Sequence, residues 1–151
     1  MMIEYVKMHK GVMAPTRANP SDAGLDIYAF MPKKKIAIGS GENAIVPTGL
    51  KFGIPHGYML QVCNRSSMGA KRSLIVGAHI IDSGYDGEVF IDLHNVGQRP
   101  QLIEHYAKIA QIVMVPVVSF RALETSQDNL YKWYPITISD RGGGSLGSTG
   151  Q

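Results

Sequence analysis

The sequence has little cysteine, little net charge and no long apolar run, and each shortage excludes a class of protein. Its 151 residues include one cysteine, Cys63, which excludes an intramolecular disulfide and argues against a secreted disulfide scaffold. No second ligand accompanies this cysteine at the spacing of a zinc site, so we expect a buried structural thiol.

Segments that would direct the chain to or through a membrane are also missing. Residues 1–10 lack the apolar core of a signal peptide. The longest apolar run, 109–118, contains Gln111 and Pro116 and is too short to span a bilayer. We therefore expect no membrane partner and a cytoplasmic location. If a virus or phage encodes the chain, the expected location is the interior of the host cell. A nuclear location is also open.

The net charge of +3 is small for a protein of this length. The densest basic run, 33–35, follows Pro32 and lies between two apolar segments, where a solvated loop or a guarded strand edge accounts for it. We therefore expect no nucleic-acid partner.

Glycine, proline and short β-rich runs dominate what is present. The 17 glycines and 8 prolines separate these runs, and 44% of the residues are hydrophobic, which suits one compact domain. The expected strands cover residues 5–8, 25–29, 44–46, 50–52, 58–62, 89–93 and 109–118. Strands and turns at this spacing indicate an all-β sandwich or barrel. One helical turn is expected near 68–72, with Ser66 and Ser67 as its caps.

One turn combines an acid with an aromatic ring. The apolar run 74–76 and the strand 89–93 flank it, so we expect a hairpin. Asp82 and Tyr85 stand close together in that turn, an arrangement that suits a general base beside a stacking surface. Turns also favour aspartate and glycine for backbone reasons alone, so a purely structural role stays open at this point.

Polar side chains that suit an anion gather in two further places. Arg65, Ser66 and Ser67 open the expected helical turn, and an arginine with hydroxyls and free amides is a generic phosphate site. A capped surface turn would have the same residues. Gln111 interrupts an apolar strand, so it needs hydrogen-bond partners in the core or in a site.

The chain changes character after residue 139. Residues 140–150 hold glycines, Arg141 and hydroxyl side chains, a composition that cannot form a core and predicts a flexible tail. The same residues can also act as a lid, because glycine amides and an arginine can close over phosphates. We favour the lid.

These separate features occur together in one known family. The chain resembles the trimeric dUTPases (deoxyuridine 5′-triphosphate nucleotidohydrolases) over nearly its whole length, and it carries five family motifs in order, at 23–29, 65–69, 77–88, 108–113 and 141–150. The resemblance implies a domain over 1–139 that consists of a distorted jelly-roll β-barrel and a flexible C-terminal arm. A glycine-rich C-terminal lid would follow over 140–151. The resemblance also implies a homotrimer with active sites between its subunits.

The implied activity is hydrolysis of dUTP to dUMP and pyrophosphate, which keeps uracil out of DNA and supplies dUMP for thymidylate synthesis. Asp82 would be the catalytic base for a water that attacks the α-phosphorus, and Asp26 would stand behind that water. Mg²⁺ would be the cofactor, held by substrate phosphates and water with no direct protein ligand.

The resemblance also assigns the substrate contacts. The triphosphate would contact Arg65, Ser66, Ser67 and Gln111. The deoxyribose would pack on Tyr85, whose ring excludes a 2′-hydroxyl. Backbone groups would read uracil at Val76, Gly77, Ala78, Ile80, Ile81 and Phe90. The closing tail would contribute Arg141, Leu146, Gly147 and Ser148, with Leu146 in place of the family's phenylalanine.

Some positions fit a related activity. The homologous dCTP deaminases share the barrel, and His79, Gly84 and Asp92 match their pattern around the aspartate and on the following strand. Against this, Ala70 stands where a second arginine is expected, and the chain ends in the dUTPase manner. Deamination of dCTP, alone or combined with dUTP hydrolysis, is therefore the alternative function. A trimeric nucleotide-binding signalling scaffold is a second alternative.

Overall fold

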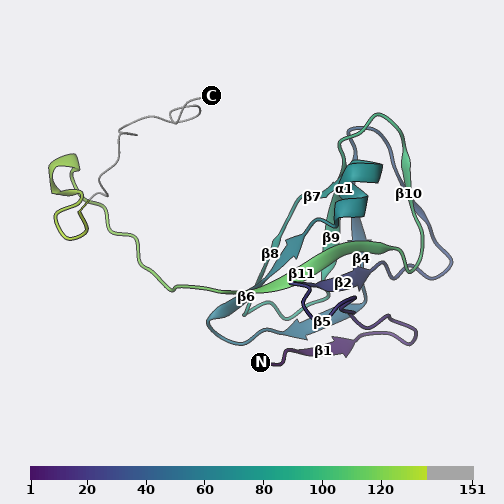
Figure 1. The fold of residues 1–151 in the computed structure, drawn as a ribbon, viewed down its shortest axis with the longest axis horizontal. Coiled ribbons are helices and arrows are strands. Elements are labelled where there is room, and N and C mark those ends of the chain that lie inside the picture. Colours follow the sequence, from purple (N-terminus) through teal and green to yellow (C-terminus); the bar gives the residue numbers. More distant parts are fainter. Residues whose placement is uncertain (136–151) are drawn as a thin grey trace. The chain divides into compact units, whose positions relative to one another are not determined.

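The computed structural model describes residues 1–135 of the chain. These residues form mostly strands, drawn in Figure 1, and all seven strands expected from the sequence are present. The strands are β1 (Glu4–Lys7), β2 (Leu25–Tyr28), β3 (Ile36–Ile38), β4 (Asn43–Pro47), β5 (Leu50–Gly53), β6 (Tyr58–Cys63), β7 (Leu74–Val76), β8 (Ile80–Asp82), β9 (Phe90–Asn95), β10 (Gln101–Ile103) and β11 (Lys108–Pro116). The helices are α1 (Ser66–Arg72) and η1 (Gln127–Asn129).

Alternating burial explains why these segments form strands. Along β9, Ile91, Leu93 and Asn95 are buried, while the residues between them face outward and are partly or fully exposed. Successive side chains of a strand point to opposite faces of its sheet, so this period of two buries one face and leaves the other accessible. The polar Asn95 is satisfied in the core, because its side-chain amide donates to the carbonyls of Ile38 and Arg99.

The strands of the described residues form four antiparallel sheets. The largest has the order β2-β11-β6-β8, the next has the order β4-β9-β7, and β1-β5 and β3-β10 form two smaller pairs. Figure 1 shows the long β11 crossing this part of the molecule beside β2 and β6. The all-β prediction is confirmed, and the arrangement is consistent with the expected distorted jelly-roll barrel.

The core lies among the inward faces of the two larger sheets. Its fully buried side chains include Ile27 of β2, Leu60 of β6 and Ile109 of β11 from one sheet. The other sheet contributes Leu93 of β9 and Val46 of β4. Burying one such aliphatic side chain stabilises the fold by about 1.5–3 kcal/mol, so these residues hold both sheets in place around the loops at the barrel edge.

The hairpin predicted around Asp82 is confirmed in the pairing of its two flanking strands, but the two strands are not joined by a simple turn. β7 pairs with β9 as expected, but the segment between them contains β8, which pairs with β6 in the other sheet. The change of partner occurs within three residues, since the Gly77 N–H donates to the Asp92 carbonyl and the His79 carbonyl accepts from the Val62 N–H. Residues 82–89, called here the Asp82 turn, therefore connect two sheets.

Helix α1 also corrects the sequence prediction. Its N-cap position is Arg65, and no side chain caps its first turn, so Ser66 and Ser67 lie inside the helix instead of capping it. The helix ends at Ser73, which adopts the left-handed conformation. Cys63, at the end of β6, is partly exposed and not buried as expected.

The chain divides into two compact units, Met1–Ser119 and the part from Phe120 onward. All the strands belong to the first unit, and the predicted boundary between residues 139 and 140 lies outside the described residues. No helix within residues 1–135 has the length and apolar character needed to cross a membrane.

Candidate active site

The first candidate cavity has a volume of about 280 Å³ and lies where β2, β11 and the start of α1 meet. Three of the predicted phosphate contacts, Arg65, Ser66 and Gln111, line it together with Asp26. The remaining lining residues are Ala18, Asp22, Ala23 and Gly24. Residues far apart in the sequence thus meet around one polar hollow, which is suited to an anion because it contains a guanidinium.

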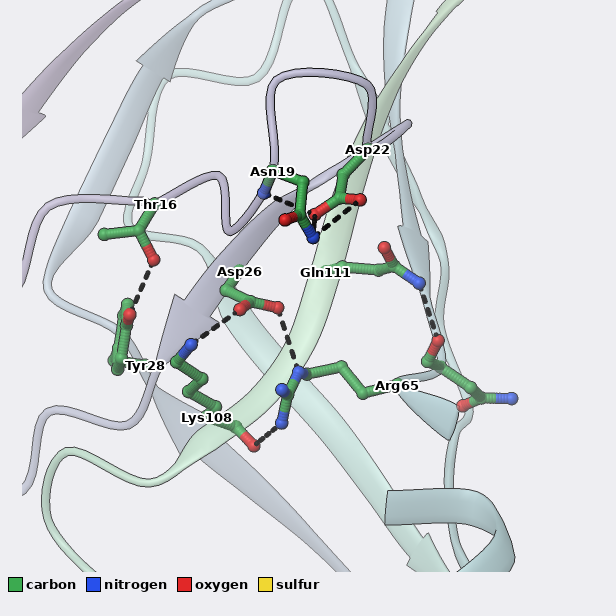
Figure 2. Close-up of polar contacts among 9 residues, drawn as sticks. Thr16, Asn19, Asp22, Asp26, Tyr28, Arg65, Lys108 and Gln111 are labelled. Carbon is green, nitrogen blue, oxygen red and sulfur yellow. Dashed lines mark hydrogen bonds and ion pairs between the residues drawn. The ribbon is translucent and has the colours of Figure 1, made fainter. Parts of the chain in front are cut away.

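A carboxylate between two cations fixes the arginine of this cavity. Arg65 Nε donates to Asp26 Oδ1 at 2.9 Å, and Lys108 Nζ donates to Asp26 Oδ2, also at 2.9 Å. Arg65 Nη1 also donates to the Lys108 carbonyl at 3.3 Å (Figure 2). The Asp26 side chain is only 15% exposed, whereas the Arg65 and Lys108 side chains are 24% and 39% exposed, so the carboxylate is shielded and the cations remain accessible to water. Within this network the two cations exceed the one carboxylate by a single charge, and the Asp22 carboxylate on the cavity wall balances that charge.

The charge network also acts on Lys108. The hydrogen bond and the attraction from Asp26 raise the pKa of the Lys108 ammonium above its ordinary value of 10.5. The same ammonium lies 5.7 Å from the centre of the Tyr28 ring, a cation–π distance. Lys108 therefore stays charged at all ordinary pH values.

Gln111 joins the cavity to the neighbouring strands. Its side-chain amide donates to the Asn64 carbonyl at 3.0 Å, and the Asn64 side-chain oxygen accepts from the Val76 N–H at 2.7 Å. On the opposite side, a Cβ added at Gly24 would lie 2.9 Å from Gln111 Oε1. The same Cβ would lie 2.9 Å from the backbone carbonyl oxygen of Ile112, so the close approach to β11 requires glycine at position 24. The bond to Asn64 satisfies the Gln111 side chain that was predicted to need partners.

The edge of the cavity is formed by a self-bonded loop. The Asn19 N–H donates to Asp22 Oδ2 at 2.8 Å (Figure 2). Arg17 donates to the Asp22 carbonyl. These contacts place the Asp22 carboxylate on the lining of the cavity. In the sequence Asp22 gives no signal of a site, because aspartate in a turn has an ordinary backbone explanation.

The second candidate cavity, of about 210 Å³, belongs to the Asp82 turn. Asp82 and Tyr85 line it, as the sequence predicted for a shared site. Ile80, Ile81 and Phe90, predicted to read the base, also line it, with Glu88 and Val89 completing the wall. No residue lines both cavities, so within one chain the acid and the phosphate-binding residues form two separate groups.

Other predicted site residues lie elsewhere. Ser67 is partly buried inside α1, and Val76, Gly77 and Ala78 follow one another where β7 leaves its sheet. These four residues line neither cavity. Arg141, Leu146, Gly147 and Ser148 lie outside the described residues. The His79 side chain is exposed.

Asp92 is held in place by its neighbours. Its Oδ1 accepts from the Asn43 amide at 2.9 Å, and its Oδ2 lies 2.9 Å from His94 Nε2. The Asn43 hydrogen bond, with smaller help from His94 and the Ala78 N–H, holds the pKa of Asp92 below its ordinary value of 3.8, although burial raises it. Asp92 is thus an ionised structural carboxylate that contacts the segment leaving β7.

Sequence reasoning missed four residues that shape the two cavities. Lys108 and Glu88 stood inside recognised motifs, and Asp22 and Asn64 stood beside them. A charged residue at the start of an apolar strand was the one available signal for Lys108. The contacts of Glu88 and Asn64 join residues distant in the sequence, and those of Asp22 are the local contacts of an ordinary turn, so no local pattern announces these three residues.

Comparison with known proteins identifies the family. The dUTPase family model matches residues 10–148. A curated relative, the deoxyuridine 5′-triphosphate nucleotidohydrolase of Chlamydia trachomatis serovar D, is 33% identical over 149 residues, covering 97% of this chain and 97% of the relative. The enzyme of the same name from Gloeobacter violaceus is 37% identical over 138 residues, covering 90% of this chain and 88% of the relative.

Solved structures share the fold. A Staphylococcus bacteriophage 80alpha dUTPase variant with dUpNHpp matches with a TM-score of 0.80 at 23% identity, over 99% of both chains. A dUTPase variant from phage phi11 of S. aureus, which coordinates a structural Mg(II) ion, matches with a TM-score of 0.76 at 21% identity, over 85% of this chain and 99% of that one. With its family model and its curated relatives matched over nearly its whole length, the chain belongs to the dUTPase family.

Proposed function

We propose that the chain hydrolyses dUTP to dUMP and pyrophosphate, the activity for which its curated relatives are named. The observation that carries the assignment of the base is the free carboxylate of Asp82, which makes no hydrogen bond or ion pair within residues 1–135 while it lines a cavity with Tyr85. The carboxylates of Asp26, Asp86 and Asp92 are each paired. An unpaired carboxylate can accept a proton.

In this proposal the Asp82 carboxylate takes a proton from a water that attacks the α-phosphorus. The bond between the α- and β-phosphates breaks, so that dUMP keeps the oxygen of the water and pyrophosphate leaves with the bridging oxygen. No covalent intermediate on the protein is needed, and catalysis consists of positioning and charge neutralisation.

The Arg65 cavity would hold the triphosphate. Because Asp26 binds Nε of Arg65, the guanidinium has a set orientation and its terminal Nη2 is available to a phosphate oxygen. Ser66 and Gln111 line the same cavity, and the Ser66 hydroxyl would support charge that develops near the bridging oxygen. Ser67 would add a contact from the same helical turn.

Mg²⁺ fits this site as an ion carried by the triphosphate. Within residues 1–135 no group of three or more His, Cys, Asp or Glu side chains is placed to hold a metal, and Asp26 is already occupied by two cations. Phosphate oxygens and water would be the ligands, with Asp22 at the cavity edge able to accept from a coordinated water. When bound, the ion would neutralise part of the phosphate charge.

The nucleoside would occupy the cavity of the Asp82 turn. Tyr85 would lie under the deoxyribose and leave no room for a 2′-hydroxyl. Backbone groups of Ile80, Ile81 and Phe90, which line this cavity, would read uracil together with those of Val76, Gly77 and Ala78, because backbone donors and acceptors can match the pattern of uracil and mismatch that of cytosine. The closing tail, with Arg141, Leu146, Gly147 and Ser148, would cover the site; these residues lie outside the described part of the chain.

A homotrimer would bring the two cavities together. Asp82 and Arg65 line different cavities of one chain, so a complete site takes the Asp82 turn from one copy and the Arg65 cavity from a neighbour. In this arrangement the tail would come from the third copy. The separation of acid from phosphate site supports this proposal over a monomeric enzyme.

No observation favours the alternative of dCTP deamination. Asp92, which matches the catalytic glutamate of the deaminases by position, is bonded to Asn43 and His94. A carboxylate with a lowered pKa and occupied oxygens is a poor base.

The test is the product profile of the pure protein with Mg²⁺ across dUTP, dCTP, dTTP and UTP. We expect dUMP and pyrophosphate from dUTP, and little turnover of the other three nucleotides. Release of dUTP or dUMP from dCTP would overturn the assignment in favour of a deaminase. Binding of dUTP without turnover would instead support the signalling scaffold.

A further inference from the structure

Glu88 lines the cavity of Asp82 and Tyr85, although the sequence assigned it no role. Its side chain makes one hydrogen bond and its backbone carbonyl makes another. Its carboxylate oxygen Oε1 accepts from the Gly49 N–H at 2.8 Å, and its backbone carbonyl accepts from the Tyr85 hydroxyl at 2.7 Å. Glu88 therefore joins the connection between β4 and β5 to the ring of Tyr85.

The connection between β4 and β5 is a firm anchor. Thr48 is 1% exposed, and its hydroxyl donates to the Val89 carbonyl at 2.6 Å. The Val89 N–H in turn donates to the Leu50 carbonyl at 2.8 Å. Together with the bond from Gly49, these contacts tie Glu88 and Val89 to buried backbone, so the end of the Asp82 turn has little freedom.

The ring of Tyr85 lies directly across Gly87. A Cβ added at Gly87 would stand 2.8 Å from the Tyr85 hydroxyl oxygen and 2.9 Å from Cζ, closer than real contacts allow. The backbone of Gly87 is not in the left-handed region, so the ring and not the backbone requires glycine here. The position of Tyr85 is thus set by Gly87 below the ring and by the Glu88 carbonyl at its hydroxyl.

We propose that Glu88 is a positioning residue that holds the Tyr85 ring against the sugar and so sets selection for deoxyribose over ribose. This inference rests on the proposed function, in which Tyr85 excludes the 2′-hydroxyl. Without the Glu88 carboxylate, the buried Gly49 N–H loses its acceptor, and the end of the Asp82 turn keeps only the bonds of Val89 to Thr48 and Leu50. The carbonyl that holds the Tyr85 hydroxyl then shifts, and the ring no longer closes the space that a 2′-hydroxyl would need.

The experiment compares kcat/KM for dUTP and for UTP in the full-length protein. Glu88→Ala should lower the dUTP-to-UTP ratio by about tenfold, within the range that a displaced contact group costs. Glu88→Gln should keep the ratio near that of the wild type, because its amide oxygen can still accept from Gly49. Glu88→Asp keeps the charge but is one methylene too short to reach, so the ratio should fall.

Two further variants separate positioning from general destabilisation. Glu42 makes the same kind of contact at a remote turn, where its carboxylate accepts from the Gly39 N–H at 2.9 Å, and Glu42→Ala should leave the ratio unchanged. Gly87→Ala should lower the ratio, since its methyl group displaces the ring directly.

The possible results distinguish this inference from the proposed function. If the wild type favours dUTP strongly and Glu88→Ala and Glu88→Asp keep that preference, Glu88 does not position Tyr85. A dUTP-to-UTP ratio as low in Glu88→Gln as in Glu88→Ala would also overturn the inference. Selection would then require the negative charge of Glu88 and not a side chain long enough to accept from Gly49. If the wild type fails to hydrolyse dUTP at all, the proposed function itself is wrong.

Discussion

At the scale of single residues, pairing separates the carboxylates by role. Asp26 is bonded to Arg65 and Lys108 and acts by orienting the arginine. Asp92 is bonded to Asn43 and His94 and acts on the backbone beside it. Asp82 is exposed and unpaired within residues 1–135, so its oxygens are free to accept a proton. The hydrogen-bond donors near each aspartate therefore decide what its carboxylate can do at each of the three positions.

Replacing Asp82 by asparagine tests the role of base. Asp82→Asn keeps the shape of the side chain and removes the proton acceptor, so kcat for dUTP should fall by about 10²–10⁴-fold while dUTP binding measured by calorimetry persists. Asp86 is the matched control, because it is a carboxylate of the same turn that pairs with Lys51. Asp86→Asn should keep nearly full turnover. Unchanged kcat in Asp82→Asn would remove Asp82 from this role.

At the scale of elements, the site depends on a chain segment that changes sheets. β7 pairs with β9 and β8 pairs with β6, and Gly77 to His79 make the transition. Asp92 on β9 contacts this transition through the Ala78 N–H. A strand that leaves one sheet for another forms a corner, and here the corner places Asp82 at the end of β8, at the edge of the barrel.

The bond between Asn43 and Asp92 should make stability depend on pH. The folded-state pKa of Asp92 is lowered, so the ionised carboxylate stabilises the fold above about pH 3.8 and this contribution is lost as the pH falls through the lowered value. Asn43→Ala should therefore reduce the free energy of unfolding in urea by about 1 kcal/mol at neutral pH. The difference should shrink toward acid pH.

A double mutant provides the control for this prediction. In an Asp92→Asn background, Asn43→Ala should have the same effect at every pH, because no carboxylate is left to titrate. The chain concentration must stay constant, since assembly also contributes to stability. A pH-independent effect of Asn43→Ala in the wild-type background would contradict the account.

At the scale of the whole molecule, a single chain exposes features that suit assembly. Phe120, Leu123 and Trp133 are each at least 80% exposed. Large apolar side chains that are exposed on one chain can be covered by contact with another protein surface. The two cavities of one chain also hold complementary halves of a site. Both observations are expected if neighbouring copies complete the structure.

Mixing two inactive variants tests the shared site. Asp82→Asn and Arg65→Ala chains should each be inactive alone. When they are co-refolded in equal amounts, trimers form in which an intact turn faces an intact Arg65 cavity, and about a quarter of the wild-type turnover should return. Light scattering on the same samples gives the oligomeric state. A mixture as inactive as its components would show that Asp82 and Arg65 act within one chain.

Removing the tail tests the lid. A chain that ends at Asp140 lacks Arg141 and the glycine-rich residues, and we expect the proposed trimer to persist in light scattering while kcat for dUTP falls by about 10²-fold. The tail is proposed to exclude water and to cover the phosphates, roles that do not hold subunits together. Dissociation of the trimer on truncation would show that the tail is structural.

Much of the fold could be predicted from the sequence because strands announce themselves locally. Apolar residues at a period of two, bounded by glycine and proline, located seven strands near their observed positions. The three-residue strands β3 and β10 gave no such signal; they exist because they pair with each other. The caps predicted at Ser66 and Ser67 are wrong, because the Arg65 carbonyl already accepts from the Met68 and Gly69 N–H groups and the helix begins at Ser66.

The sequence by itself determined the fold class and the family, because strand periodicity is local and the five ordered motifs can be read along the chain. Only the tertiary structure decided which polar residues meet. Asp82 and Arg65 line separate cavities. Asn43 donates a hydrogen bond to the Asp92 carboxylate, and the Gly49 N–H donates to the Glu88 carboxylate. The physical reason is that hydrogen bonds and ion pairs form between atoms within a few ångströms in space, and the sheet topology brings those atoms together from distant parts of the sequence.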